Sequence, residues 1–91
     1  MRLISPRMLR EFAKRPGRHD ARPALEGWRK VVAAADWRNF ADVRRTFRSA
    51  DAVGDCVVFN VCGNKYRLVT RIRYRSGVVY TLRVMTHAEY D

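Results

Sequence analysis

The 91-residue sequence has few acidic residues, and this shortage narrows the classes of protein to which it can belong. Nine Asp and Glu residues stand against 19 Lys and Arg residues, which gives a net charge of +10. A chain this basic is expected to bind an anionic partner such as nucleic acid, a ribosome, an acidic protein or an anionic membrane. The acidic residues form no cluster of the kind that a two-metal nuclease needs.

Cysteine and histidine are also scarce, with two residues of each type. Cys56 precedes an apolar run and Cys62 lies in a predicted turn, so we expect two separate thiols rather than a disulfide. A zinc site would need more ligands, and His19 and His87 stand at no recognisable metal spacing. We therefore expect neither a metal nor a cofactor.

Long apolar runs are absent, since none approaches the roughly 20 residues of a membrane-spanning helix. The N-terminal sequence MRLISPRMLREF lacks the apolar segment of a signal peptide, so we expect a cytoplasmic protein. Hydrophobic residues make up 47% of the chain and aromatic residues 11%, which is typical of a globular protein. This length suits a single core, so we expect one domain over residues 1–91.

The first half of the chain reads as a short strand followed by helices. Residues 2–4 are β-like and are expected to form an edge strand. Ser5-Pro6 is expected to begin a first helix that ends near Lys14. Apolar residues at helical spacing predict a second helix that begins near Asp20, which is a usable cap, and Asn39 is expected to cap a short third helix.

The second half reads as a sheet. Residues 49–55 are small and polar and are expected to form a turn. An apolar run from Val57, a turn at Val61 to Asn64 and a strand from Lys65 then predict a hairpin, because Gly and Asn tolerate the positive φ of tight turns. A third strand is expected from Val78 to about Thr86. Together these elements predict an α+β fold, with two to three helices packed on one face of a small antiparallel sheet.

Alternation along the second hairpin strand separates apolar from cationic side chains. One face, expected to pack on the core, holds Tyr66, Leu68, Thr70, Ile72 and Tyr74. The other holds Lys65, Arg67, Arg71 and Arg73, interrupted only by Val69. In the third strand, alternation predicts one face of Val78, Tyr80, Leu82 and Val84, and another of Arg83 and His87 with Met85.

The positive charge of the sheet part is concentrated in one segment. Residues 1–50 carry 13 basic and five acidic side chains, whereas residues 51–91 carry six and four. Five of those last six cations lie between Lys65 and Arg75. Arginine binds phosphate oxygens in a bidentate manner and histidine exchanges protons near neutral pH. Arg83, His87 and Tyr90 are expected near this face.

These groups fit the cleavage of RNA without a metal, in which the 2′-OH attacks the adjacent phosphorus. The same pattern also fits a plain binding patch or a solvated surface. His87 and Tyr90 can be structural, Asn64 can serve only the turn, and Trp37 can be core or can stack on a base. Pattern alone therefore supports an RNA-phosphate site and leaves catalysis open.

The motifs FNVCGNKYRLV and MTHAEYD together resemble the HigB family of type II toxin–antitoxin toxins, within the RelE-like mRNA interferases. The segments MRLIS, REF and ADWRNFADVRRTF extend the likeness over nearly the whole chain. The resemblance implies a RelE-like fold and ribosome-dependent cleavage of translated mRNA in the 30S A site region. It also implies neutralisation by a HigA-type helix-turn-helix antitoxin.

The resemblance also suggests which residues act. By motif, the site includes Asn64, Lys65, Arg67, His87 and Tyr90. From strand alternation we add Arg71, Arg73 and Arg83, and we also include Arg75, a cation of the turn that follows the strand. The expected catalytic residues are Arg67, His87, Tyr90, Lys65 and Arg73, and the expected RNA-binding residues are Asn64, Arg71, Arg83 and Arg75. The rival hypothesis is a non-catalytic module that blocks translation by occupying RNA or the ribosome.

Two departures from the family pattern stand out. Cys62 occupies a position where members usually have another glycine, so we expect a stiffer turn or an exposed thiol. The sequence stops at Asp91, whereas members usually continue for some residues. If such a tail carries site contacts, we expect lower activity.

Overall fold

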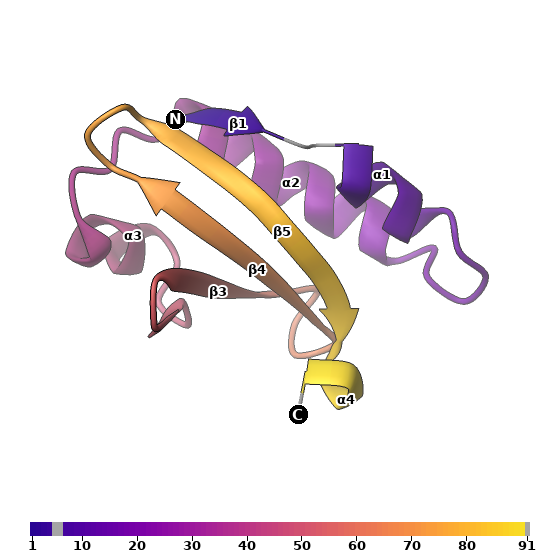
Figure 1. The fold of residues 1–91 in the computed structure, drawn as a ribbon. Helices are drawn as coiled ribbons and strands as arrows, with labels where there is room; N and C mark the ends of the chain where they lie inside the picture. Colours follow the sequence, from indigo (N-terminus) through magenta and orange to yellow (C-terminus); the bar gives the residue numbers. More distant parts are fainter. Residues whose placement is uncertain (5–6, 91) are drawn as a thin grey trace.

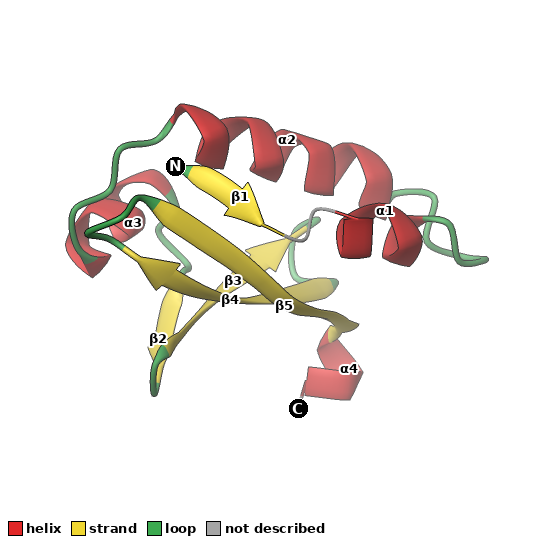
Figure 2. Cartoon of the chain, turned by 45° about the horizontal axis from the view of Figure 1, so that its top comes forward, coloured by secondary structure: helices red, strands yellow, loops and turns green. Residues whose placement is uncertain are grey.

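The computed structural model describes residues 1–4 and 7–90, and its centre is a five-stranded sheet (Figures 1 and 2). The elements are β1 (Arg2–Ile4), α1 (Arg7–Ala13), α2 (Ala21–Ala34), α3 (Phe40–Thr46), β2 (Asp51–Val53), β3 (Cys56–Val61), β4 (Tyr66–Arg73), β5 (Val78–Thr86) and α4 (His87–Tyr90). The strand order is β1-β5-β4-β3-β2. This arrangement confirms the predicted α+β class.

The sheet is larger than the predicted one and is mixed. The pairs β2–β3, β3–β4 and β4–β5 are antiparallel, whereas β1 pairs with β5 in parallel. The prediction of a turn over residues 49–55 was wrong, because β2 lies within that segment and pairs with β3. A strand of three residues with an exposed side-chain pattern has too little apolar alternation to be recognised in a sequence.

The helices α1 and α2 lie along one face of the sheet, which Figure 2 shows from the side. The predicted apolar stripe of α2 is buried, with Leu25, Trp28 and Val32 each at most 3% exposed. Trp28 meets the ring of Phe59 on β3 edge to face, with the ring centres 5.3 Å apart. Aromatic pairs in this geometry add to the stabilisation that burial provides.

The third helix closes the other end of the same core. Trp37, just before α3, stacks on Phe59 and meets Phe47 edge to face. Its indole N–H donates to the hydroxyl of Thr46 at 3.2 Å, so the ring is buried with its polar atom satisfied. Trp37 is therefore core, which was one of its two predicted roles, and its ring is not exposed to stack on a base.

A bulge in β5 changes which of its side chains lie on each face of the sheet. Val69 of β4 pairs with Arg83 and Thr70 pairs with Thr81, so Leu82 is an extra residue. The prediction that Val78, Tyr80, Leu82 and Val84 share one face was therefore wrong. Before the bulge the core side holds Val79 and Thr81, and after it the core side holds Val84. Simple alternation cannot reveal a bulge.

Two of the predicted caps were tested by the structure. Asn39 caps α3 as predicted, since its side-chain oxygen accepts from the backbone N–H of Asp42 at 3.0 Å. Asp20 precedes α2 but makes no capping hydrogen bond, so that prediction was wrong. The predicted helix start at Ser5-Pro6 lies outside the described residues.

The hairpin turn spans Cys62 to Lys65, one residue later than predicted, because Val61 already pairs with Tyr66. Both Cys62 (φ 57°) and Gly63 (φ 66°) adopt left-handed backbone angles. Such angles strain residues other than glycine by about 1–2 kcal/mol. A glycine would occupy the first position without that strain, which fits the family preference noted above. The Cys62 thiol is half-buried, and its burial raises its pKa.

Candidate RNA-cleaving site

Four of the predicted site residues meet at one corner of the sheet, where β4 begins and β5 ends beside α4 (Figure 1). Arg67 is the second residue of β4, and Asn64 precedes that strand in the hairpin turn. His87 and Tyr90 come from α4. The hairpin and the short helix thus bring together the two motifs that were separated in the sequence.

Arg67 lies at the centre of this cluster and is only 8% exposed. Its Nη2 donates to the side-chain oxygen of Asn64 at 2.8 Å and lies 2.6 Å from Nδ1 of His87. Its Nη1 donates to the backbone oxygens of Asn64 and Tyr66 at 3.4 and 3.3 Å. A guanidinium can only donate, so Nδ1 of His87 is the acceptor and the ring proton lies on Nε2.

Tyr90 covers the outer side of the cluster. The guanidinium carbon of Arg67 is 6.0 Å from the centre of the Tyr90 ring, at the limit of a cation–π contact. Tyr90 is 37% exposed, so part of this residue is open to a ligand. The cluster therefore combines a held cation, an imidazole and a partly exposed tyrosine.

The helix α4 is stabilised at its start by two hydrogen bonds between Thr86 and Glu89. The hydroxyl of Thr86 accepts from the backbone N–H of Glu89 at 3.2 Å, and the Glu89 carboxylate accepts from the backbone N–H of Thr86 at 2.9 Å. This reciprocal pair is a capping box. The backbone N–H of His87 also donates to the carbonyl of Lys65 at 2.8 Å, which ties the helix start to the hairpin.

A hollow of about 350 Å³ lies against Arg67 and Tyr90 and adds residues that the sequence analysis missed. Its lining is Arg44, Arg48, Ser49, Ala50, Asp51, Val58, Asn60, Arg67 and Tyr90. Asn60 faces Arg67 across the hairpin, and a correctly placed turn would have revealed that pairing. Arg44 and Arg48 come from the end of α3, and only the fold brings them here. Three arginines around one hollow suit a phosphate group.

Lys65, the fifth residue carried over by motif, points to a different partner. Its ammonium donates to the Asp20 carboxylate, which also accepts from the hydroxyl of Tyr66 at 2.7 Å. The hydrogen bond from Lys65, followed by the one from Tyr66, lowers the pKa of Asp20. The pairing in turn raises the pKa of Lys65.

The remaining predicted cations lie farther along the face of the sheet that α1 and α2 do not cover, which we call the open face. Arg71 pairs with Tyr80 and Arg73 with Val78, while Arg83 pairs with Val69 and Arg75 follows the end of β4. Arg73 is six residues from Arg67, or about 20 Å at the usual rise per strand residue. The structure therefore does not bring Arg73 to the Arg67 cluster.

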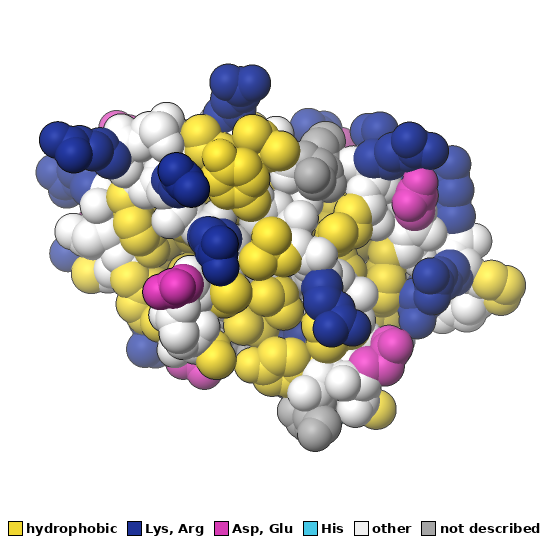
Figure 3. All heavy atoms as spheres, in the orientation of Figure 1, with side chains coloured by type: hydrophobic (Ala, Val, Ile, Leu, Met, Phe, Trp, Pro, Cys, Tyr) yellow, Lys and Arg dark blue, Asp and Glu magenta, His cyan; other side chains and the backbone are white. Residues whose placement is uncertain are grey.

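The open face is not uniformly cationic. Figure 3 shows it in the orientation of Figure 1, with a continuous hydrophobic area among separate Lys and Arg side chains. Arg73 packs over the ring of Tyr80 at 5.9 Å, and Leu82 is 39% exposed. The arginines are therefore spaced over an apolar surface rather than crowded against one another.

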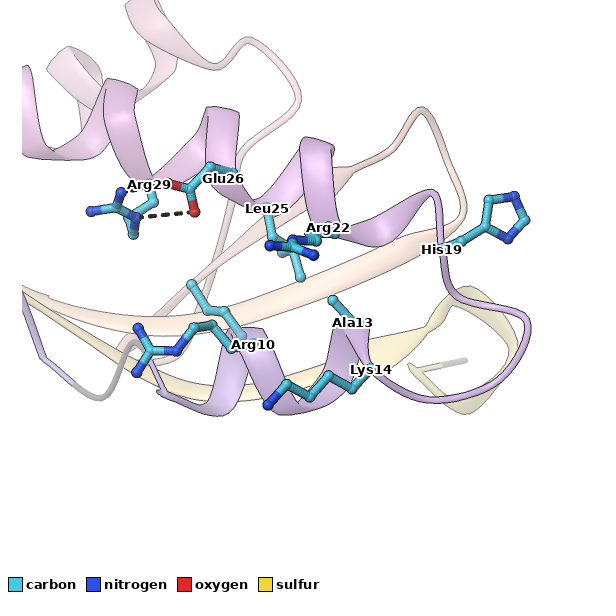
Figure 4. Close-up of a pocket in the computed structure, with 9 residues that line it drawn as sticks. Arg10, Ala13, Lys14, His19, Arg22, Leu25, Glu26 and Arg29 are labelled. Carbon is cyan, nitrogen blue, oxygen red and sulfur yellow. Dashed lines mark hydrogen bonds and ion pairs between the residues drawn. The ribbon is translucent and has the colours of Figure 1, made fainter.

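A second hollow, of about 680 Å³, lies between α1 and α2 (Figure 4). Its lining is Leu9, Arg10, Ala13, Lys14, His19, Arg22, Leu25, Glu26 and Arg29. Glu26 is paired with Arg29, as the dashed lines show, and the other charged groups are cations. Among these lining residues the carboxylate is already paired, so the groove offers mainly positive charge.

Both cysteines are free thiols, as predicted. Among residues 1–4 and 7–90, no three His, Cys, Asp or Glu side chains gather where they could hold a metal ion. Within the same residues, no helix has both the length and the apolar character needed to cross a membrane.

Comparison with known proteins identifies close similarities. A family model described as HigB_toxin, RelE-like toxic component of a toxin-antitoxin system, matches residues 21–91. The "mRNA interferase toxin HigB" of Escherichia coli K12 is 30% identical over 94 residues, which cover 100% of this chain and 88% of that protein. The "mRNA interferase HigB" of Shigella flexneri shows the same identity and coverage.

Proposed function

This chain belongs to the HigB toxin family, and we propose that it is an endoribonuclease that cleaves translated mRNA on the ribosome. The observation that supports the proposal is the contact of Arg67 with Asn64 and His87 beside a hollow lined by further arginines. The names of the relatives agree with this reading, since each describes an mRNA interferase.

The chemistry that we propose uses the 2′-OH of the RNA as its nucleophile. The 2′-oxygen bonds to the adjacent phosphorus, the bond from phosphorus to the 5′-oxygen breaks, and the products are a 2′,3′-cyclic phosphate and a 5′-OH. Such a reaction needs a base, an acid and cations that stabilise the phosphorane charge. RNA alone supplies the 2′-OH, which makes it the substrate class.

The residues divide these tasks as follows in our proposal. Arg67 binds the scissile phosphate through its donors, assisted by Arg44 and Arg48 from the hollow. When the phosphate draws Arg67 away from His87, the guanidinium no longer donates to Nδ1, and this nitrogen takes the proton of the 2′-OH. In this proposal the Tyr90 hydroxyl donates the proton that the leaving 5′-oxygen takes up.

The other cations have supporting roles in this proposal. Arg71, Arg73, Arg75 and Arg83 bind RNA or ribosome phosphates beyond the scissile bond, which suits their spacing along the open face. Lys65 contributes through its partner Asp20 rather than as a free proton relay. Asn64 holds the guanidinium of Arg67 until substrate binds.

The setting of the reaction is also part of the proposal. We propose a metal-independent enzyme of the cytoplasm, acting in the 30S A site region and requiring no cofactor. We further propose a HigA-type helix-turn-helix antitoxin whose acidic segment covers the arginines of the open face. The net charge of +10 supplies the electrostatic reason for such a segment.

Mapping of mRNA 5′ ends after a brief pulse of expression tests the activity, with wild type compared with His87→Ala. We expect new 5′-OH ends inside translated frames for wild type, absent in the variant and suppressed by the antitoxin. Growth arrest with intact mRNA would instead favour a non-catalytic module that occupies the ribosome. Cleavage that persists in His87→Ala would keep the enzyme and move proton transfer to another residue.

A further inference from the structure

The loop between α1 and α2 contacts both segments that carry the candidate site. We infer that Arg18 and Asp20 in this loop are positioning residues, which hold the hairpin turn and α4 in the geometry that cleavage needs. The inference rests on the proposed function. Neither residue contacts Arg67 or His87 directly in the described hydrogen bonds, so both act through other side chains.

Asp20 holds the hairpin side of the site. One carboxylate oxygen accepts from Lys65 and the other from Tyr66, while the backbone carbonyl of Asp20 is 3.7 Å from the Cys62 thiol. Tyr66 is 5% exposed, and its ring packs edge to face on Phe12 of α1. Asp20 thus fixes both ends of the turn that presents Asn64, together with the residue just before Arg67.

Arg18 holds the α4 side. Its Nη2 lies 3.6 Å from the Glu89 carboxylate, and its guanidinium carbon sits 3.9 Å from the centre of the Phe12 ring. Glu89 is the residue that closes the capping box of α4, so the ion pair reaches the helix at its first turn. The same helix carries His87 and Tyr90.

The burial of Arg18 partly offsets the stability that its contacts with Phe12 and Glu89 provide. Its side chain is only 16% exposed, and its Nη1 is buried without a hydrogen-bond partner among the described residues. A buried cation with an unmatched donor generally costs more than an apolar side chain of similar size. The ion pair to Glu89 gives this arginine a role in the placement of α4.

The contacts of Asp20 and those of Arg18 both act on the backbone where the hairpin turn meets α4. Lys65, which Asp20 holds through its side chain, accepts the N–H of His87 with its carbonyl. A displaced Lys65 would therefore move the start of α4 as well as the turn. An ångström-scale error in such a site can lower a rate constant by about 100-fold.

The test measures single-turnover cleavage on ribosomes programmed with mRNA, at varied ribosome concentration, for Arg18→Gln, Asp20→Asn and Glu89→Gln. Gln at position 89 preserves the capping box but removes the charge that Arg18 meets. The control is Arg7→Gln, which removes the exposed ion pair between Arg7 and Glu11 on α1. Hydrogen exchange of the α4 amides is recorded for every variant.

We expect the three variants to cleave about 10- to 100-fold more slowly than wild type, with an apparent KM changed less than about threefold. Arg18→Lys should recover much of the rate, and Arg18→Gln with Glu89→Gln should be no slower than either alone. Variants that cleave at the rate of Arg7→Gln would overturn the inference, as would a loss confined to KM.

The hydrogen-exchange measurement separates this inference from the proposed function. If wild type fails to cut mRNA, the proposed function is refuted and the positioning claim rests on exchange alone. Faster exchange at Ala88 to Tyr90 in Arg18→Gln and Asp20→Asn than in Arg7→Gln would then support it. Unchanged exchange would overturn it.

Discussion

Arg67 supplies both a positive charge and several hydrogen-bond donors in a fixed geometry. A lysine could supply the charge, but a single ammonium cannot reach Asn64, His87 and the two backbone carbonyls in the fork geometry that the guanidinium uses. The side chain is therefore held in place before any substrate arrives. Such preorganisation is a large part of how enzymes stabilise charge in a transition state.

Arg67→Lys should consequently lower the cleavage rate constant by about 100-fold although the charge is kept. The measurement is single-turnover cleavage of ribosome-bound mRNA, with Arg7→Lys on the exposed face of α1 as the matched control. A rate within threefold of wild type would show that charge alone, rather than the fork, is what the site needs.

Residue types and local motifs were enough to predict Asn64, Arg67, His87 and Tyr90 as neighbours. Alternation along β4 places Arg67 and Arg73 on one face, but their separation of six residues along the strand already implies about 20 Å between them, which the prediction overlooked. It also gave no sign that Lys65 would meet Asp20, since that contact spans 45 residues. Local sequence patterns likewise could not predict that Arg44 and Arg48 would line the hollow beside Arg67.

At the scale of elements, the hairpin turn and α2 place opposite demands on glycine. Gly63 needs a left-handed backbone (φ 66°), whereas Gly27 sits inside a regular helix where a side chain would meet nothing within 4 Å. The same substitution should therefore have opposite effects at the two positions.

Gly27→Ala should raise the free energy of unfolding by about 0.5–1 kcal/mol, because alanine loses less backbone entropy in a helix. Gly63→Ala should lower it by about 1 kcal/mol, because alanine is strained at positive φ. Urea denaturation of the two variants beside wild type checks both values. Shifts of the same sign would contradict the backbone argument.

The sequence predicted the three-residue β1 but missed other short or irregular features. β2 and the bulge at Leu82 are set by pairing between strands rather than by a repeating pattern, whereas α4 begins at a local capping box that the prediction overlooked. Longer periodic elements such as α2 and β4 were predicted correctly, because their apolar stripes extend over several repeats.

For the whole molecule, two carboxylates link distant or successive elements. Asp20 joins the α1–α2 loop to the hairpin. Asp42 of α3 accepts from the backbone and side chain of Arg38 and from Arg45. Hydrogen bonds, chiefly from Lys65 to Asp20 and from the Arg38 backbone to Asp42, lower both pKa values below the usual 3.8.

A lowered pKa in the folded state means that the unfolded chain binds more protons at acid pH. The stabilisation is therefore complete above about pH 5 and is lost as the pH falls through 3.8 toward the lower folded values. We expect the urea midpoint of wild type to fall between pH 7 and pH 3, and Asp20→Asn to show a smaller fall. Asp55→Asn, which removes an exposed carboxylate, should retain the wild-type fall. An identical fall in Asp20→Asn would refute the assignment.

The parallel pairing of β1 with β5 has a consequence for when this protein becomes active. Arg2 pairs with Val78, so the first strand has its partner only after 76 further residues have been synthesised. His87 and Tyr90 emerge later still. At synthesis rates of about 5–20 residues per second, the nascent chain spends seconds without a finished sheet or site. If the protein cuts messages during translation, it cannot do so until its own chain has been synthesised at least as far as Tyr90.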